Sequence, residues 1–143
     1  MKTISFRWYC FFAACLALAT ATIELPPELL DYINTLHVKC LASTGKSEEL
    51  HSQYDVKTNT PDMSCYMKCL MVESRWMDDD GTINYNFIIN EFELFDQDLP
   101  ELRDIMVNAV NQCRDVTGND PCHKAYNFNY CIYEADQETW FLA

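Results

Sequence analysis

Cysteine is the residue type in this sequence whose number and spacing point most clearly to chemistry. Eight cysteines are present, and two of them, Cys10 and Cys15, fall in an apolar run near the N-terminus. The remaining six are Cys40, Cys65, Cys69, Cys113, Cys122 and Cys131. An even number of cysteines in a short secreted chain favours three disulfides over free thiols. Zinc is the rival interpretation, but the sequence has no C-x2-C knuckle with a matching pair of histidines.

The spacing of these cysteines limits how they pair. Cys65 and Cys69 are four residues apart, which places them on one face of a helix. A bridge between them would strain the usual Cβ–Cβ distance of about 3.8 Å, so each is expected to pair elsewhere. Cys122 and Cys131 are nine residues apart and therefore face two different neighbours. Several pairings remain, and spacing alone does not choose among them.

The N-terminus has the pattern of a secretory signal peptide. Two cations precede the apolar run at 8–19, and residues 19–21 fit a small-x-small cleavage site. A run of twelve apolar residues is too short to cross about 30 Å of hydrocarbon as a helix. The sequence therefore predicts a secreted protein with a signal peptide at 1–21 and one domain at 22–143.

The mature chain is strongly acidic. Removal of the signal peptide leaves 8 Lys and Arg against 22 Asp and Glu, a formal charge of −14. This charge repels nucleic acid and anionic lipid head groups, so we expect neither a nucleic-acid partner nor stable membrane association. Aromatic and aliphatic residues recur throughout, and Gly and Pro number only 3 and 5, which disfavours an acidic disordered chain.

Between the cysteines the sequence has the periodicity of helices. Prolines at helix starts, Ser47 as a cap and glycines as stops mark six expected helices. Their expected ranges are 26–45, 47–54, 62–76, 84–95, 100–118 and 121–135. In the fifth, Gly118 is expected to end the helix. No stretch shows sustained alternation of apolar and polar residues with hairpin turns, so strands are not expected. The expected fold class is therefore all-α, one compact six-helix domain.

No motif for a metal site or for catalysis has all the residues that it requires in this sequence. Residues 76–81 resemble part of a calcium loop, but Trp76 and Phe87 would stand where acidic oxygen donors are needed. His51 and His123 have no obvious metal or nucleophile companions in the sequence, and no G-x-S-x-G occurs. We therefore expect no enzyme activity, no metal site and no cofactor.

The cysteine series also resembles a known family. Successive cysteines from Cys40 to Cys131 are separated by 24, 3, 43, 8 and 8 residues, and this resembles the six-cysteine signature of insect odorant-binding proteins, the pheromone- and general-odorant-binding family. Local strings agree, including PPELL at 26–30, CYMKC at 65–69 and WFLA at 140–143. The resemblance covers nearly the whole mature chain and implies six helices around an apolar pocket. The disulfides it implies are Cys40–Cys69, Cys65–Cys122 and Cys113–Cys131.

The resemblance further implies which side chains line the pocket. Methionines recur every four residues at 63, 67 and 71, and methionine suits a pocket that accepts several ligand shapes. The wall residues implied within the helices are Met67, Leu70, Trp76, Met106, Ala109 and Val110. Ordinary core packing is the alternative role for each of them. Asn127 stands where the family often has a tryptophan, so one aromatic wall is expected to be missing.

The end of the chain is expected to form a lid. Twelve residues follow Cys131, too few for the seventh helix of moth pheromone carriers. Leaving Trp140, Phe141 and Leu142 in water would cost about 1.5–3 kcal/mol each, so we expect them to bury themselves over the pocket. A frayed terminus is the alternative.

In the antennal branch that this sequence resembles, a tyrosine after the second cysteine and a histidine before the first hold the terminal carboxylate. The matching positions here are Tyr66, His37 and Ala143. We expect them to form a latch that acidification opens, because in water carboxyl groups protonate at about pH 3–4 and histidine at about 6.5. A solvated or core histidine is the alternative role for His37.

These features predict a secreted carrier of a small hydrophobic ligand, an odorant or pheromone, through sensillar lymph. An odorant receptor and a second copy of the chain are the further partners that the resemblance implies. The alternative is a scavenger or protein-interaction module in saliva, venom or reproductive fluid. An amine scavenger needs a carboxylate in its pocket, and no acidic residue falls clearly within the apolar stripes. A protein binder would instead expose an apolar patch of several hundred Å².

Overall fold

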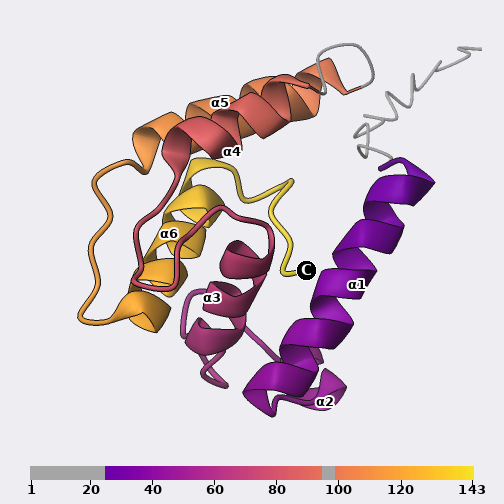
Figure 1. Cartoon of the computed structure of the whole chain (residues 1–143), viewed down its shortest axis with the longest axis vertical. Helices are drawn as coiled ribbons and strands as arrows, with labels where there is room; N and C mark the ends of the chain where they lie inside the picture. The colour runs from indigo at the N-terminus through magenta and orange to yellow at the C-terminus, as the bar shows by residue number, and fades with distance from the viewer. Residues whose placement is uncertain (1–24, 95–98) are drawn as a thin grey trace, which may run out of the picture.

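Six helices form the regular structure of residues 25–94 and 99–143, the part of the chain that the computed structural model describes (Figure 1). They are α1 (Pro27–Thr44), α2 (Glu48–Ser52), α3 (Ser64–Glu73), α4 (Tyr85–Glu93), α5 (Pro100–Gln112) and α6 (Pro121–Ala135). Within these ranges the only β pairing is two isolated bridges, so the all-α prediction is confirmed. The signal peptide predicted at 1–21 lies outside the described residues. None of the described helices is both long and apolar enough to cross a bilayer.

Local side-chain chemistry explains where the helices start and stop. Proline occupies the first turn of α1, α5 and α6, where a missing N–H costs nothing. Ser47 caps α2 by accepting from the N–H of Leu50 at 3.2 Å, and Asp120 caps α6 by accepting from the N–H of His123 at 2.8 Å. Gly45 ends α1 with φ 66°, a left-handed conformation that glycine adopts without strain.

Helix α3 is shorter than the predicted range of 62–76. The Asp62 carboxylate accepts from the N–H of Ser64 at 2.9 Å and so forms a turn ahead of the helix. After the helix, Arg75 has φ 62°, a left-handed conformation that prevents continuation. Helix α2 also ends two residues early, and the end predicted for α4 at residue 95 lies outside the described residues.

Gly118 does not end α5, contrary to the prediction. The helix stops at Gln112, with Cys113 as its C-cap, and an irregular segment follows. Gly118 lies instead against the first turn of α6, where an added Cβ would come within 2.6 Å of the Cα of Lys124. Glycine at this position therefore permits close packing of the loop on α6.

Three disulfides cross-link the helices in the pairing that the family resemblance implies, which is thereby confirmed. Cys40–Cys69 joins α1 to α3, Cys65–Cys122 joins α3 to α6, and Cys113–Cys131 joins the end of α5 to α6. Helix α3 packs on both α1 and α6, and α5 packs on both α4 and α6. In Figure 1 the α4–α5 pair lies across one end of α6, and α1 stands apart from that pair.

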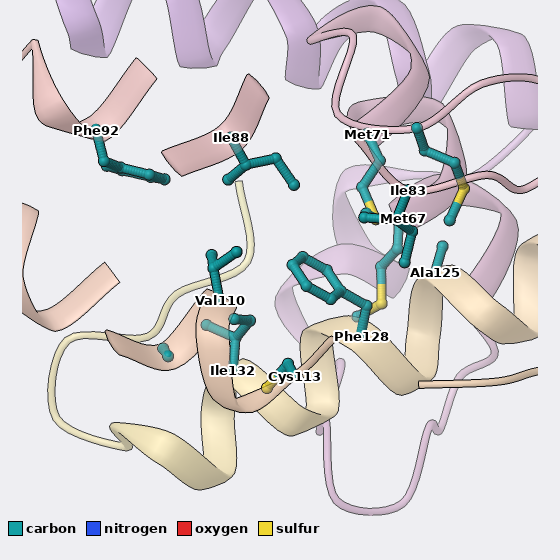
Figure 2. Close-up of a cluster of buried hydrophobic side chains, with 12 residues drawn as sticks. Met67, Met71, Ile83, Ile88, Phe92, Val110, Cys113, Ala125, Phe128 and Ile132 are labelled. Atoms are coloured by element: carbon teal, nitrogen blue, oxygen red, sulfur yellow. The ribbon is translucent and has the colours of Figure 1, made fainter. Parts of the chain in front are cut away.

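The main core lies among α3, α4, α5 and α6. Figure 2 shows Phe128 in its middle, with Met67 on one side and Val110 and Ile132 on the other. A second, smaller cluster lies between α1 and α3. Its buried members are Cys40, Leu41, Met63 and Tyr66. The C-terminal half of α1 thus packs on α3, and the N-terminal half of α1 is left to cover other side chains.

We predict that Gly118→Ala lowers the free energy of unfolding by about 3 kcal/mol, because the added methyl meets main-chain atoms of Lys124 that cannot rotate away. Gly45→Ala is the matched control. Its added Cβ has no atom within 4 Å, so it should cost only the roughly 1–2 kcal/mol of a left-handed L-residue. Urea denaturation followed by circular dichroism measures both losses, and equal losses would contradict the packing role of Gly118.

Candidate ligand-binding site

An apolar cavity of about 250 Å³ lies among the helices. Helices α1 and α5 line it with Leu29, Ile33, Leu36, Leu102, Ile105, Met106 and Ala109. Helices α3, α4 and α6 line it with Met67, Leu70, Met71, Phe92, Phe128 and Ile132. The last residues of the chain complete the wall. The space is close to the lower end of the roughly 300–1,000 Å³ range of small-molecule sites and has their apolar character.

Eight of the nine wall residues predicted from the sequence come together around this cavity. They are Met67, Leu70, Trp76, Met106, Ala109, Trp140, Phe141 and Leu142. Val110 is the exception, because it is fully buried in the main core and does not line the cavity (Figure 2). One step along a helix turns the side chain by about 100°, so Val110 faces the core while Ala109 faces the cavity.

Sequence reasoning missed the wall that α1 supplies. Leu29, Ile33 and Leu36 recur at spacings of four and three residues, which marks one helical face. The pattern predicts a helix, but the group that this face covers depends on how α1 crosses α3. Asn127, where an aromatic wall was expected to be lost, is not part of the lining. Its side-chain amide donates to the carbonyl of Thr117 at 2.6 Å.

The lining also contains polar side chains, two of them carboxylates. They are Tyr32, Ser74, Glu91, Asn129, Asp136 and Thr139. No acidic residue falls clearly within the apolar stripes of the sequence, but Glu91 from α4 and Asp136 from the residue after α6 belong to the lining. Burial and the negative charge of Glu91 raise the pKa of Tyr32, so its phenol stays protonated at neutral pH.

The chain turns back over the cavity directly after α6. The Asp136 carboxylate accepts from the N–H groups of Glu138 and Thr139 at 3.0 and 3.2 Å, which closes a tight turn. In Figure 1 the tail then runs back between the helices and ends between α3 and α1. The tail therefore lies across the cavity and contributes to its wall.

The apolar residues of the tail are buried to different degrees. Trp140 packs edge-on against Tyr133, with ring centres 5.6 Å apart, and Trp140 and Leu142 both pack against the main core. Phe141 lines the cavity but remains 54% exposed, so the burial expected for it is not found. The tail thus packs against the core and the cavity through Trp140 and Leu142, while Phe141 faces partly outward.

The end of the tail meets a cluster of histidine, tyrosine and glutamate side chains. Tyr66 donates to the main-chain oxygen of Ala143, and His51 Nε2 lies 3.0 Å from the same oxygen. His37 Nδ1 lies 2.7 Å from the Tyr66 hydroxyl, and His37 Nε2 lies 2.7 Å from a carboxylate oxygen of Glu48. The three predicted residues therefore do lie together. Sequence reasoning missed Glu48 and His51, which are one turn apart on α2.

Tyr66 is the side chain of this cluster that links the tail to His37. Tyr66 is fully buried, and burial together with the charge of Glu48 raises its pKa, so it remains a donor. Its hydroxyl donates to Ala143, and the same oxygen lies within hydrogen-bond distance of His37 Nδ1. His37 therefore bridges Tyr66 and Glu48 through its two ring nitrogens.

Two histidines and a carboxylate are also residue types that bind zinc and related metals. One ligand atom from each of His37, Glu48 and His51 lies within 4.8 Å of the other two. His51 therefore has the companions that sequence reasoning did not find. In this arrangement His37 Nε2 already bonds to Glu48, and His51 Nε2 already bonds to the main-chain oxygen of Ala143.

Known proteins share this architecture. Residues 23–135 match the PBP/GOBP family. General odorant-binding protein 19d of Drosophila melanogaster is 27% identical over 124 residues, 82% of each chain. The crystal structure of odorant-binding protein lmigOBP1 of Locusta migratoria is 26% identical, with a TM-score of 0.65 over 82% of this chain and 88% of its own. Odorant-binding protein 5 of Apis mellifera has a TM-score of 0.69 at 23% identity, over 85% of this chain and 100% of its own.

These matches confirm the family that the cysteine spacing indicates. Family and fold support a role as a carrier of hydrophobic ligands, and the matched proteins are odorant-binding carriers rather than enzymes. Secretion is typical of such proteins. The chain belongs to the PBP/GOBP family of insect odorant-binding proteins.

Proposed function

We propose that this protein is a secreted carrier that takes up small hydrophobic volatiles, odorants or pheromones, in its internal cavity. Residues 1–21 serve as the signal peptide, and residues 22–143 form the carrier domain, which moves ligand through sensillar lymph to an odorant receptor. The observation that carries the proposal is the apolar cavity of about 250 Å³ beneath the tail. A homodimer, which the family resemblance implies, stays a prediction.

The energetics of the cavity favour a cargo. At about 24 cal/mol per Å³, an empty hollow of 250 Å³ costs on the order of 6 kcal/mol if its walls do not relax. Three disulfides of roughly 2–4 kcal/mol each supply stabilisation of the same size. A ligand that fills the hollow restores the lost contacts, so the folded protein and the bound ligand stabilise one another.

In this proposal the tail is the lid of the cavity, and Ala143 supplies a terminal carboxylate to the latch. Every ring nitrogen of this cluster that meets the tail, Tyr66 or Glu48 faces an oxygen, and a protonated histidine can donate to an oxygen, so protonation of His37 or His51 is compatible with the latch. Protonation of the Ala143 and Glu48 carboxyl groups removes the charge with which they accept. Release on acidification therefore depends on the carboxyl groups rather than on the histidines.

The alternative function, a scavenger or protein-interaction module, has less support. A protein-binding module needs an exposed apolar patch, whereas the apolar faces of α1 and α5 surround an interior cavity. An amine scavenger needs a carboxylate at its pocket, and Glu91 and Asp136 meet that requirement. The chemistry of the ligand, rather than the fold, is what separates this alternative from the carrier.

Filling the cavity should weaken ligand binding and leave the protein folded. Met106 lines the cavity, and Met106→Trp places a larger ring in that space. We expect the affinity of the refolded, oxidised mature chain for a fluorescent apolar probe at pH 7 to fall at least about tenfold, a loss of about 1.4 kcal/mol. Val107→Trp is the control, since Val107 lies outside the cavity lining. Absence of probe binding by the wild type, or equal loss in both variants, would contradict the carrier function.

Loss of the Tyr66 hydroxyl should loosen the lid. Tyr66→Phe keeps the ring and removes the donor to Ala143, a bond to a charged acceptor worth about 1.5–3 kcal/mol in this proposal. We expect chymotrypsin to cleave after Trp140 and Phe141 roughly tenfold faster, as measured by mass spectrometry. The matched control is Tyr126→Phe, which removes a hydroxyl bond to the carbonyl of Val56 at 2.9 Å. Equal cleavage rates in the wild type and both variants would remove the tyrosine from the latch.

The pH at which ligand is lost should identify the group that titrates. A carboxylate contributes to the closed lid above its pKa, and the contribution is lost as the pH falls through that pKa. Carboxyl groups titrate at about pH 4 in water, so we expect probe affinity to change little between about pH 7 and 5.5 and to fall severalfold by about pH 4. Circular dichroism at each pH controls for unfolding. A loss of probe affinity centred at about pH 6.5 that disappears in His37→Gln would show instead that His37 is the group that controls release.

A further inference from the structure

The cavity lining offers several hydrogen-bond acceptors and no cationic side chain among the described residues. The hydroxyl and amide groups can donate as well, as can the indole N–H groups of Trp76 and Trp140, but six side chains carry an oxygen that can accept a hydrogen bond. They are Tyr32, Ser74, Glu91, Asn129, Asp136 and Thr139. Among the described residues, no Lys, Arg or His belongs to the lining. A ligand that donates a hydrogen bond therefore finds acceptors, whereas an anionic ligand finds no cation.

Asn129 is the polar group of the lining whose orientation is best defined. Its Nδ2 donates to the carbonyl of Ala125 at 2.9 Å and lies 3.6 Å from the sulfur of Met71. A carbonyl oxygen can only accept, so the amide nitrogen must face Ala125. The side-chain oxygen, Oδ1, is then the atom that remains available. Asn129 is thus held in place between α6 and α3 with a fixed acceptor.

No described residue donates to this oxygen. In the described part of the chain, every fully buried side-chain nitrogen or oxygen has a partner, so the unbonded Oδ1 of Asn129 is not fully buried and stays accessible. An accessible acceptor beside an apolar cavity suits one hydrogen-bond donor on an otherwise apolar ligand. Such a placed polar group selects among ligands of equal size, because an unmatched polar atom costs free energy on binding.

We propose that the preferred ligand is an apolar molecule with a hydrogen-bond donor, a hydroxyl or an ammonium group, that bonds to Asn129 Oδ1. The inference rests on the carrier function proposed above and adds the ligand class. Carboxylate ligands are disfavoured, since a buried carboxylate needs a cation or several donors, and Glu91 and Asp136 would repel it. The same two carboxylates attract an ammonium group.

Four ligands of matched length test the class. Octan-1-ol and heptyl methyl ether are isomers that differ in the presence of a donor, while octan-1-amine and octanoate carry opposite charges at pH 7. Displacement of the fluorescent probe from the wild-type protein measures each affinity. We expect octan-1-ol to bind about fivefold more tightly than the ether and at least about tenfold more tightly than octanoate, as one net hydrogen bond and one unpaired charge imply. The ratio of the amine to the alcohol shows which donor is preferred.

Two substitutions connect the preference to Asn129. Asn129→Leu removes the acceptor and should bring the alcohol and the ether to equal affinity, while ether binding is kept. Asn127→Leu is the matched control. It also removes a hydrogen bond from a side-chain amide to a main-chain carbonyl, that of Thr117, but Asn127 lies outside the lining. Asn129→Asp loses the bond to Ala125 but keeps acceptor oxygens at the same position, so it should retain a preference for the alcohol over the ether and strengthen binding of the amine.

The outcomes separate this inference from the carrier function. Equal affinity for all four ligands, tight octanoate binding, or the same effect from Asn129→Leu and Asn127→Leu would overturn the ligand class and leave the carrier standing. Failure of the probe and of all four ligands to bind correctly bridged protein would overturn the carrier function, and the ligand class with it. If Asn129→Leu does not fold, the wild-type comparison and Asn129→Asp still decide.

Discussion

Two disulfides from one face of α3 bind this helix to α1 and to α6, and the rest of the structure depends on this constraint. Cys65 and Cys69 are one turn apart, and their bonds to Cys122 and Cys40 hold α6 and α1 against the same short helix. Apolar side chains otherwise pack until no space remains. Covalent links between the helices restrict that collapse, so an apolar cavity lined by α1, α3 and α6 persists at a cost of free energy that the disulfides offset.

The same cross-links position the cover of the cavity. His37 precedes Cys40 by three residues on α1, and Tyr66 precedes Cys69 by three residues on α3. The Cys40–Cys69 bond therefore lies about one helical turn from the pair that meets the tail, and it holds the 2.7 Å contact between His37 and Tyr66 in place. Packing, cavity and tail are in this way parts of one arrangement around α3.

The chemistry of the cavity follows from which helical faces meet there. Helix α5 and the first half of α1 present aliphatic stripes, whereas α6 brings Asn129 beside Phe128 and Ile132. In an acidic protein without a cation among the described lining residues, an interior of this kind favours neutral or positively charged cargo with an apolar body. The polar groups are few, and their positions rather than their number determine which ligands fit.

The sequence by itself determined the fold class, the bounds of α1 and α6 to within one residue, and, through family resemblance, the three disulfides and eight of the residues that line the cavity. Helix ends depend on proline, caps and glycine within one turn, and the cysteine spacing in the sequence is what carries the family resemblance. Only the tertiary structure decided that Val110 packs in the core, that Gly118 lies under α6, and that His51 joins the tail. It also placed Glu91 and Asn129 at the cavity. A periodic pattern states which residues share a face, but the crossing of one helix over another determines what that face meets.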